Sequence, residues 1–199
     1  MKRVPLITLI VVAGCATLRP PTSSIWEPRT EFGRSFKARY QGKLENALKD
    51  LRSIPEIGDI VAGLWLGAGA DSSARYFGAN MGTYNKYNTL RTNFEERAAS
   101  AVSELILPVL QAIAKQKEPI DDLQIAGVYV SIAWTAADFS ERYSGGELEA
   151  VQMYIPKDIV FDFLSFKFTN QDLLNKSLVF GYKSGRSIGR IQFNIGKNF

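Results

Sequence analysis

The chain has 199 residues, with 24 lysine or arginine residues against 20 aspartate or glutamate residues and a formal net charge of +4. It contains no histidine and one cysteine, Cys15, which excludes zinc sites built from cysteine and histidine as well as Ser-His and Cys-His catalysis. No calcium-loop motif is present, so no metal and no cofactor are predicted.

Residues 1–14 have the pattern of a secretory signal. Lys2 and Arg3 precede residues 4–14, which are almost all apolar or small. A positive start, an apolar run of about 7–15 residues and small residues before the cut are typical of such signals, whereas a membrane-spanning helix needs about 20. Removal of this leader lowers the 24 basic residues to 22, against 20 acidic ones, and this balance predicts no nucleic-acid partner.

The end of the apolar run, Val12-Ala13-Gly14-Cys15, resembles the lipobox of bacterial lipoproteins. The resemblance covers residues 1–18. It implies cleavage between Gly14 and Cys15, a thioether from Cys15 to diacylglycerol, and often acylation of the new amine, for example with palmitate. Two acyl chains already anchor a protein stably, because each buried methylene contributes roughly 0.8 kcal/mol. Ala16 stands where inner-membrane lipoproteins of enteric bacteria carry aspartate, which indicates the periplasmic face of the outer membrane rather than the inner membrane.

The rest of the chain is expected to be one domain on a stalk. Residues 15–31 form the lipidated cysteine and a flexible tether, in which Pro20, Pro21 and Pro28 favour extended chain. Residues 32–199 are long enough to bury a single core.

Only part of the first half of this domain receives a secondary-structure prediction. Alternation over residues 32–40 predicts a strand, and the apolar spacing of residues 43–53 predicts a helix that ends before Pro55. Residues 57–82 are apolar, then rich in glycine and alanine, then aromatic, and they receive no assignment.

A long helix is predicted from about residue 90 to about residue 117, with Lys115 and Lys117 in its last turn and Pro119 beyond it. A capping box from Thr92 to Glu95 marks its start, and Pro108 is expected to kink it. The helix has an apolar stripe made of Leu90, Phe94, Ala98, Ala101, Val102, Leu105, Val109 and Ile113.

The second half of the domain has the sequence pattern of a β-sheet. Residues 123–134 and 148–155 alternate and are joined by a turn at 142–147, and residues 178–195 predict a closing hairpin. Residues 156–166 fit either a strand or a helix, and the helix is favoured because it keeps Asp162 outside. A capping box from Thr169 to Asp172 predicts one more short helix.

These elements predict an α+β domain: a mostly antiparallel sheet of four to five strands packed with a long kinked helix and shorter helices.

Two short motifs suggest enzymes but lack what the chemistry needs. Residues 185–189 match G-x-S-x-G, yet the pattern lies at a hairpin and the chain has no histidine to serve as base. Asp158 and Asp162 stand four residues apart, so a helix would present both carboxylates on one side, as the acid pair of a glycosidase requires, although acids on an exposed helix are usually only solvated.

An aromatic cluster is the candidate ligand-binding site. It lies among asparagine residues, as in a glycan or peptide groove, and its members are Tyr76, Phe77, Tyr84 and Tyr87.

Together these patterns predict a non-catalytic, lipid-anchored protein of the bacterial cell envelope. It would bind or assemble with an envelope protein or cell-wall glycan at a membrane surface. Two alternatives are open. A carboxylate-dependent hydrolase of cell-wall glycan needs paired acids in a cleft, and a lipid or glycan carrier needs a cavity lined by residues 57–88.

Overall fold

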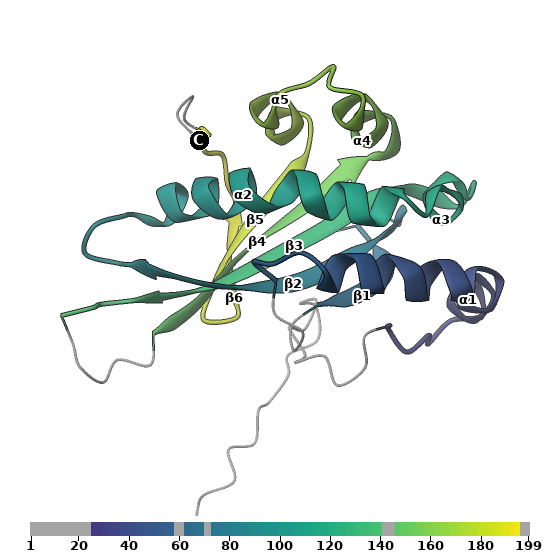
Figure 1. The fold of residues 1–199 in the computed structure, drawn as a ribbon, viewed down its shortest axis with the longest axis horizontal. Coiled ribbons are helices and arrows are strands. Elements are labelled where there is room, and N and C mark those ends of the chain that lie inside the picture. Colours follow the sequence, from purple (N-terminus) through teal and green to yellow (C-terminus); the bar gives the residue numbers. More distant parts are fainter. Residues whose placement is uncertain (1–24, 58–61, 70–72, 141–145, 196–199) are drawn as a thin grey trace, which may run out of the picture.

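The computed structural model describes residues 25–57, 62–69, 73–140 and 146–195, which form five helices and six strands (Figure 1). In chain order the elements are α1 (Glu31–Arg52), β1 (Gly63–Ala68), β2 (Arg75–Asn88), α2 (Phe94–Ala114), α3 (Lys117–Asp121), β3 (Ile125–Ala137), β4 (Glu147–Pro156), α4 (Lys157–Leu164), α5 (Asn170–Asn175), β5 (Leu178–Lys183) and β6 (Arg186–Arg190).

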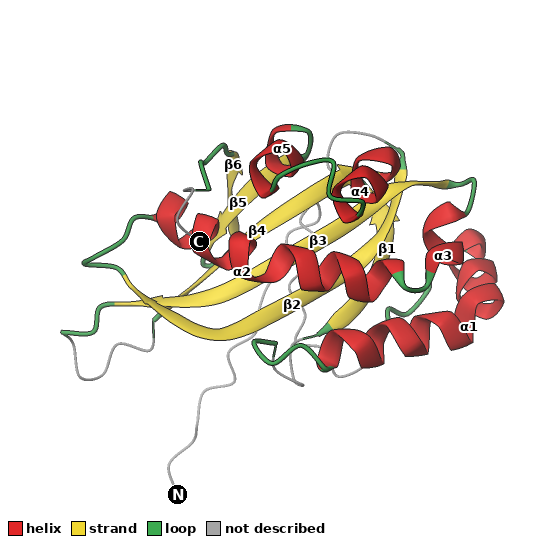
Figure 2. Ribbon diagram, turned by 45° about the horizontal axis from the view of Figure 1, so that its top comes forward, coloured by secondary structure: helices red, strands yellow, loops and turns green. Residues whose placement is uncertain are grey.

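The strands form one sheet whose spatial order follows the chain order, from β1 to β6. Of the five neighbouring pairs, β2 and β3 run parallel and the other four are antiparallel. All five helices cover one face of this sheet (Figures 1 and 2). The predicted α+β class and the mostly antiparallel sheet are confirmed. The predicted strand count was too low, because β1 and the start of β2 come from the unassigned, glycine-rich residues 57–82.

Helix α1 replaces the strand predicted at residues 32–40 and absorbs the helix predicted at residues 43–53. The Oγ1 atom of Thr30 accepts a hydrogen bond from the amide of Gly33 at 3.0 Å and caps the helix. Three aromatic side chains of α1 are four residues apart: Phe32, Phe36 and Tyr40. A spacing of four is two strand periods but also about one helical turn, so the alternation was ambiguous and the strand prediction was wrong.

Helix α2 returns the chain from the end of β2 to the start of β3, as two parallel strands require. Its N-cap is Asn93, whose Oδ1 accepts from the amide of Glu96 at 2.9 Å while the carboxylate of Glu96 accepts from the amide of Asn93 at 2.9 Å. The capping box predicted for Thr92 and Glu95 was therefore one residue early. Pro108 lies inside the helix, and the kink there stays a prediction.

By length and composition α2 could cross a membrane, but 61% of its most apolar window is buried inside the fold. Its apolar stripe packs against α1 and the sheet, so α2 serves the domain as its core helix. Leu90, which was expected in this stripe, precedes the helix and is 66% exposed, so that part of the prediction was wrong.

The helices and hairpin predicted for the last third are confirmed. Residues 156–166 contain α4, so the helical alternative was correct. Thr169 and Asp172 form the predicted capping box of α5, with the amide of Asp172 donating to the Thr169 hydroxyl at 3.1 Å. β5 and β6 pair as the predicted hairpin. The turn predicted at residues 142–147 falls mostly outside the described residues.

The two faces of the sheet carry different side chains. Apolar residues on the helix side join α1 and α2 in the main core; they include Leu64, Phe77, Met81, Val128, Val130, Ile132, Trp134, Val151, Met153 and Ile155. Three tyrosines on the opposite face form a separate cluster: Tyr76, Tyr129 and Tyr154.

The described part of the chain begins at Ile25. This residue forms a parallel bridge with Leu64 on the edge strand β1. The next residue, Trp26, lies with its ring centroid 6.1 Å from that of Phe36 and 6.4 Å from that of Phe77. Residues 25–31, expected to belong to the tether, are therefore part of the domain.

Candidate functional site

A row of aromatic rings crosses the helix-free face of the sheet. Register aligns Trp65 on β1 with Gly78 on β2, Gly78 with Tyr129 on β3, and Tyr129 with Tyr154 on β4. The rings of Trp65 and Tyr129 lie 4.4 Å apart and those of Tyr129 and Tyr154 lie 5.1 Å apart, measured between centroids. A Cβ at Gly78 would overlap the carbonyl oxygen of Tyr129, so only glycine permits this approach of β2 to β3.

The predicted ligand-binding aromatics all lie on β2 but do not gather in one place. Tyr76 joins the helix-free row, with its ring 5.2 Å from that of Tyr154. Phe77 points the other way into the main core, where it is fully buried. Tyr87 lies farther along β2, and its ring centroid is 6.1 Å from that of Trp134. Tyr84 is also a residue of β2. Successive side chains alternate between faces, so sequence neighbours on a strand cannot share a groove wall.

Two hydroxyl groups are buried in the helix-free face. The Oη atom of Tyr129 and the Oγ atom of Ser131 make no hydrogen bond of acceptable geometry to the described residues. Burial raises the pKa of Tyr129 well above its ordinary value of 10.0, and the nearby Ser131 hydroxyl offsets only part of that effect. The raised pKa keeps the Tyr129 side chain a neutral phenol at ordinary pH.

A buried ion pair occupies the helix side of the sheet. Arg97 on α2 binds Glu149 on β4 through two hydrogen bonds, Nε to Oε2 at 2.8 Å and Nη2 to Oε1 at 2.7 Å. The indole nitrogen of Trp134 donates to the same carboxylate at 2.9 Å, and Arg97 also donates to the carbonyl of Thr92. Glu149 is only 1% exposed. Both of its oxygens are occupied and shielded from solvent, so this centre fixes α2 on the sheet and cannot act on a substrate.

A second polar centre lies where α3 meets β3. The Oδ2 atom of Asp122 accepts from Arg39 at 3.1 Å and from the hydroxyl of Tyr40 at 3.0 Å, both on α1. Its backbone carbonyl accepts from Lys157 of α4 at 2.9 Å. Asp122 therefore ties three helices to the start of β3.

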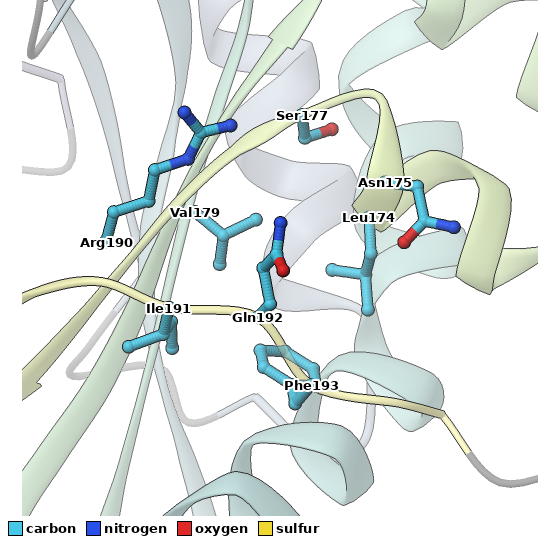
Figure 3. Close-up of a pocket in the computed structure, with 8 residues that line it drawn as sticks. All are labelled: Leu174, Asn175, Ser177, Val179, Arg190, Ile191, Gln192 and Phe193. Atoms are coloured by element: carbon cyan, nitrogen blue, oxygen red, sulfur yellow. The ribbon is translucent and has the colours of Figure 1, made fainter.

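A hollow of about 30 Å³ lies between α5, β5 and the segment that follows β6 (Figure 3). Ser177, Arg190 and Gln192 contribute polar atoms to its lining. Ligand pockets for drug-sized molecules measure about 300–1,000 Å³, whereas this volume suits a water molecule. Its lining takes nothing from residues 57–88, the segment expected to line a carrier cavity.

The acids that suggested glycosidase chemistry have other roles. Asp162 forms an ion pair with Lys167 at 2.7 Å, and Asp158 is exposed in the first turn of α4. Ser187 lies on β6, within a hairpin rather than a strand-to-helix turn. Over the described ranges, no three acidic or cysteine side chains gather as a cation site.

Cys15 and Gly14, the predicted lipidation and cleavage positions, fall outside the described residues. Neither a protein-family model, nor a curated protein sequence, nor a solved structure matches this chain.

Proposed function

We propose that this is a lipid-anchored protein of the bacterial cell envelope that works as a non-catalytic binding or assembly module at a membrane surface. One observation carries the proposal. A basic start, an apolar run and Val12-Ala13-Gly14-Cys15 stand together at the front of the chain. The lipid on Cys15 would supply the anchor, and the folded domain would supply the binding surface.

The start of the fold supports a short stalk. Residues 16–24 separate Cys15 from Ile25, the first described residue of the domain. Nine residues reach at most about 30 Å when fully extended. The domain would therefore stay close to the bilayer that holds its lipid.

The charged groups support binding rather than catalysis. Glu149 and Asp122, the buried acids, are both committed to structural partners. Six large apolar side chains of the described residues are exposed and available for contact with a partner: Leu90, Leu123, Phe139, Leu148, Phe166 and Ile188.

Metabolic labelling with an alkyne fatty acid, followed by mass spectrometry, tests the anchor. Wild type should carry label on the peptide that begins at Cys15 and should sediment with membranes. Cys15→Ser should lose the label and keep its leader, while the matched tether variant Ser24→Ala should behave as wild type. An unlabelled Cys15 in wild type would refute the proposal.

The choice of membrane is tested separately. In an enteric host, Ala16→Asp should move the protein from the outer to the inner membrane fraction, while Ala16→Ser should not. Equal distribution of the two variants would contradict the outer-membrane assignment and leave the anchor intact.

A further inference from the structure

We propose that the domain rests on anionic phospholipid headgroups through the end of the sheet at which β2 and β3 begin. We call this the basic end and define it by Arg29, Phe32, Arg34, Arg75 and Leu123. The inference builds on the proposed lipid anchor and adds an orientation and a lipid class to it.

Ile25, the first described residue, lies nearer to this end of the sheet than to the other end. Ile25 bridges Leu64, and Leu64 pairs with Ala79 of β2. Arg75, at the basic end, is four residues from Ala79, or about 13 Å along the strand, whereas Asn88 is nine residues away in the other direction, or about 30 Å. Nine residues, 16–24, separate Cys15 from Ile25, and the shorter distance from Ile25 favours the basic end over the far end for a lipid held by so short a segment.

Charge at the basic end is complementary to an anionic surface. Arg29, Arg34 and Arg75 are exposed and make no ion pair with the described residues. Glu31 is the one described acid of the α1 start that is likewise without an ion pair.

The remaining acidic and basic side chains at the basic end contribute no net charge. Four acids are paired with neighbouring bases: Glu27 with Lys37, Glu118 with Lys43, Asp121 with Lys117, and Asp122 with Arg39. Lys157 and Asp158, at the start of α4, offset each other. The described residues of the basic end therefore carry a net charge of about two positive units toward a membrane.

Apolar groups lie between these arginines. Leu123, in the turn before β3, is 100% exposed. Beside it, Gln124 accepts a hydrogen bond from Arg75 at 2.9 Å, and the guanidinium of Arg75 lies 4.3 Å from the ring centroid of Phe32. An exposed leucine beside an arginine stacked on an aromatic ring suits the boundary between headgroups and acyl chains.

The expected preference for the orientation with the basic end on the membrane can be estimated as a ratio of populations. One basic residue near an anionic leaflet favours that position about fivefold, so a net two charges favour the basic end about thirtyfold. The bias should weaken at high salt, where the screening length falls to about 3 Å at 1 M.

Reporter positions at the two ends of the sheet test the orientation. Ser73→Cys lies beside Arg75, and Thr89→Cys lies just after β2; both sites are exposed, and lipid blocks the natural thiol of Cys15. The lipidated full chain is labelled with a fluorophore and placed in phosphatidylcholine vesicles containing 30% phosphatidylglycerol and a headgroup quencher. Quenching at position 73 should exceed quenching at position 89 at least fivefold, and the ratio should fall toward one without phosphatidylglycerol or at 1 M salt.

A matched pair of double variants assigns the effect to the basic end. Arg29→Glu/Leu123→Asp should abolish the difference between the reporters, whereas Arg91→Glu/Leu90→Asp makes the same changes at the far end and should preserve it. Leu123 is 100% exposed and Leu90 is 66% exposed, so unfolding midpoints should confirm that both variants fold.

Two kinds of failure can be separated. Protein that is acylated and vesicle-bound but quenched equally at both positions, or more strongly at position 89, overturns the orientation while the anchor stands. Protein that is not acylated in its host overturns the proposed function itself.

Discussion

A buried ion pair on one face of the sheet and two buried hydroxyls on the other face differ in how fully their polar groups are satisfied. On the helix side, Arg97 and Trp134 satisfy both carboxylate oxygens of Glu149, whereas the buried hydroxyl of Tyr87 on the same side makes no hydrogen bond of acceptable geometry to the described residues. On the helix-free side, the hydroxyls of Tyr129 and Ser131 are buried without such partners. Removing one partner of a buried, fully hydrogen-bonded ion pair lowers the free energy of unfolding strongly. A buried hydroxyl without a hydrogen bond already destabilises the folded state, so its removal does not. Substitutions that remove a charge from the ion pair and substitutions that remove an unsatisfied hydroxyl should therefore differ in sign as well as in size.

The largest effect is expected when the ion pair is broken. Glu149→Gln leaves the Arg97 guanidinium buried without a counter-charge and should lower the free energy of unfolding by about 3–5 kcal/mol. Urea titration followed by circular dichroism measures the loss. The double variant Arg97→Met/Glu149→Leu removes both charges and should recover most of it. A loss below 1 kcal/mol for Glu149→Gln would show that the pair is not buried as described.

Gly78→Ala should be the next most damaging change, this time on the helix-free face. The new methyl group collides with the Tyr129 carbonyl and must push β2 away from β3, at a cost of about 2–3 kcal/mol. Gly42→Ala is the control, because a Cβ at that exposed position of α1 meets nothing within 4 Å. It should stabilise the helix by about 0.5–1 kcal/mol. Equal effects of the two substitutions would argue against the close approach of the strands.

The burial of the Tyr129 phenol should make the free energy of unfolding depend on pH in the alkaline range. Burial raises the folded-state pKa of Tyr129 above its ordinary value of 10.0, so above pH 10 the unfolded chain loses this proton while the folded chain keeps it. The stability that this group provides is complete below pH 10 and should fall by about 1.4 kcal/mol per pH unit above it. Tyr129→Phe should lack this component of the slope. Parallel pH profiles for wild type and variant would contradict the burial of the hydroxyl.

The smallest effect is expected from Tyr129→Phe at neutral pH, and it should be favourable. Removing a buried hydroxyl that has no partner should leave stability unchanged or raise it by up to about 1 kcal/mol. Tyr40→Phe is the matched control, because the Tyr40 hydroxyl donates to Asp122 at 3.0 Å. That control should lose about 1 kcal/mol, as measured by thermal or urea unfolding. A loss at Tyr129 as large as that at Tyr40 would indicate an unrecognised partner.

Local signals in the sequence predicted the parts of the fold that depend on local contacts. Each of these signals lies within one short stretch of the chain: the Thr169 capping box, the helical spacing in α4, and the alternation in β3 and β4. The β1–β2 hairpin was missed because glycine and alanine give no alternation of polarity. The error at residues 32–40 arose because aromatics four apart fit both periods.

The candidate site depended on contacts that local patterns do not encode. Tyr76 meets Tyr154 only because β2 pairs with β3 and β3 with β4 in the observed registers. The ion pair did leave a signal. Arg97 falls on the apolar stripe of α2, three residues after Phe94, and Glu149 shares the inward face of β4 with Val151. A charged residue on a buried stripe requires a counter-charge, although its distant partner could not be chosen from sequence alone.

The agreement between strand order and chain order has a kinetic consequence. Four of the five pairings join strands that follow each other directly or through short helices, so each can form as soon as its second strand has been made. The parallel pairing of β2 with β3 must wait until residues 89–124 have folded back over the sheet. Closing that long segment costs chain entropy before any contact repays it, so docking of α2 should set the folding rate.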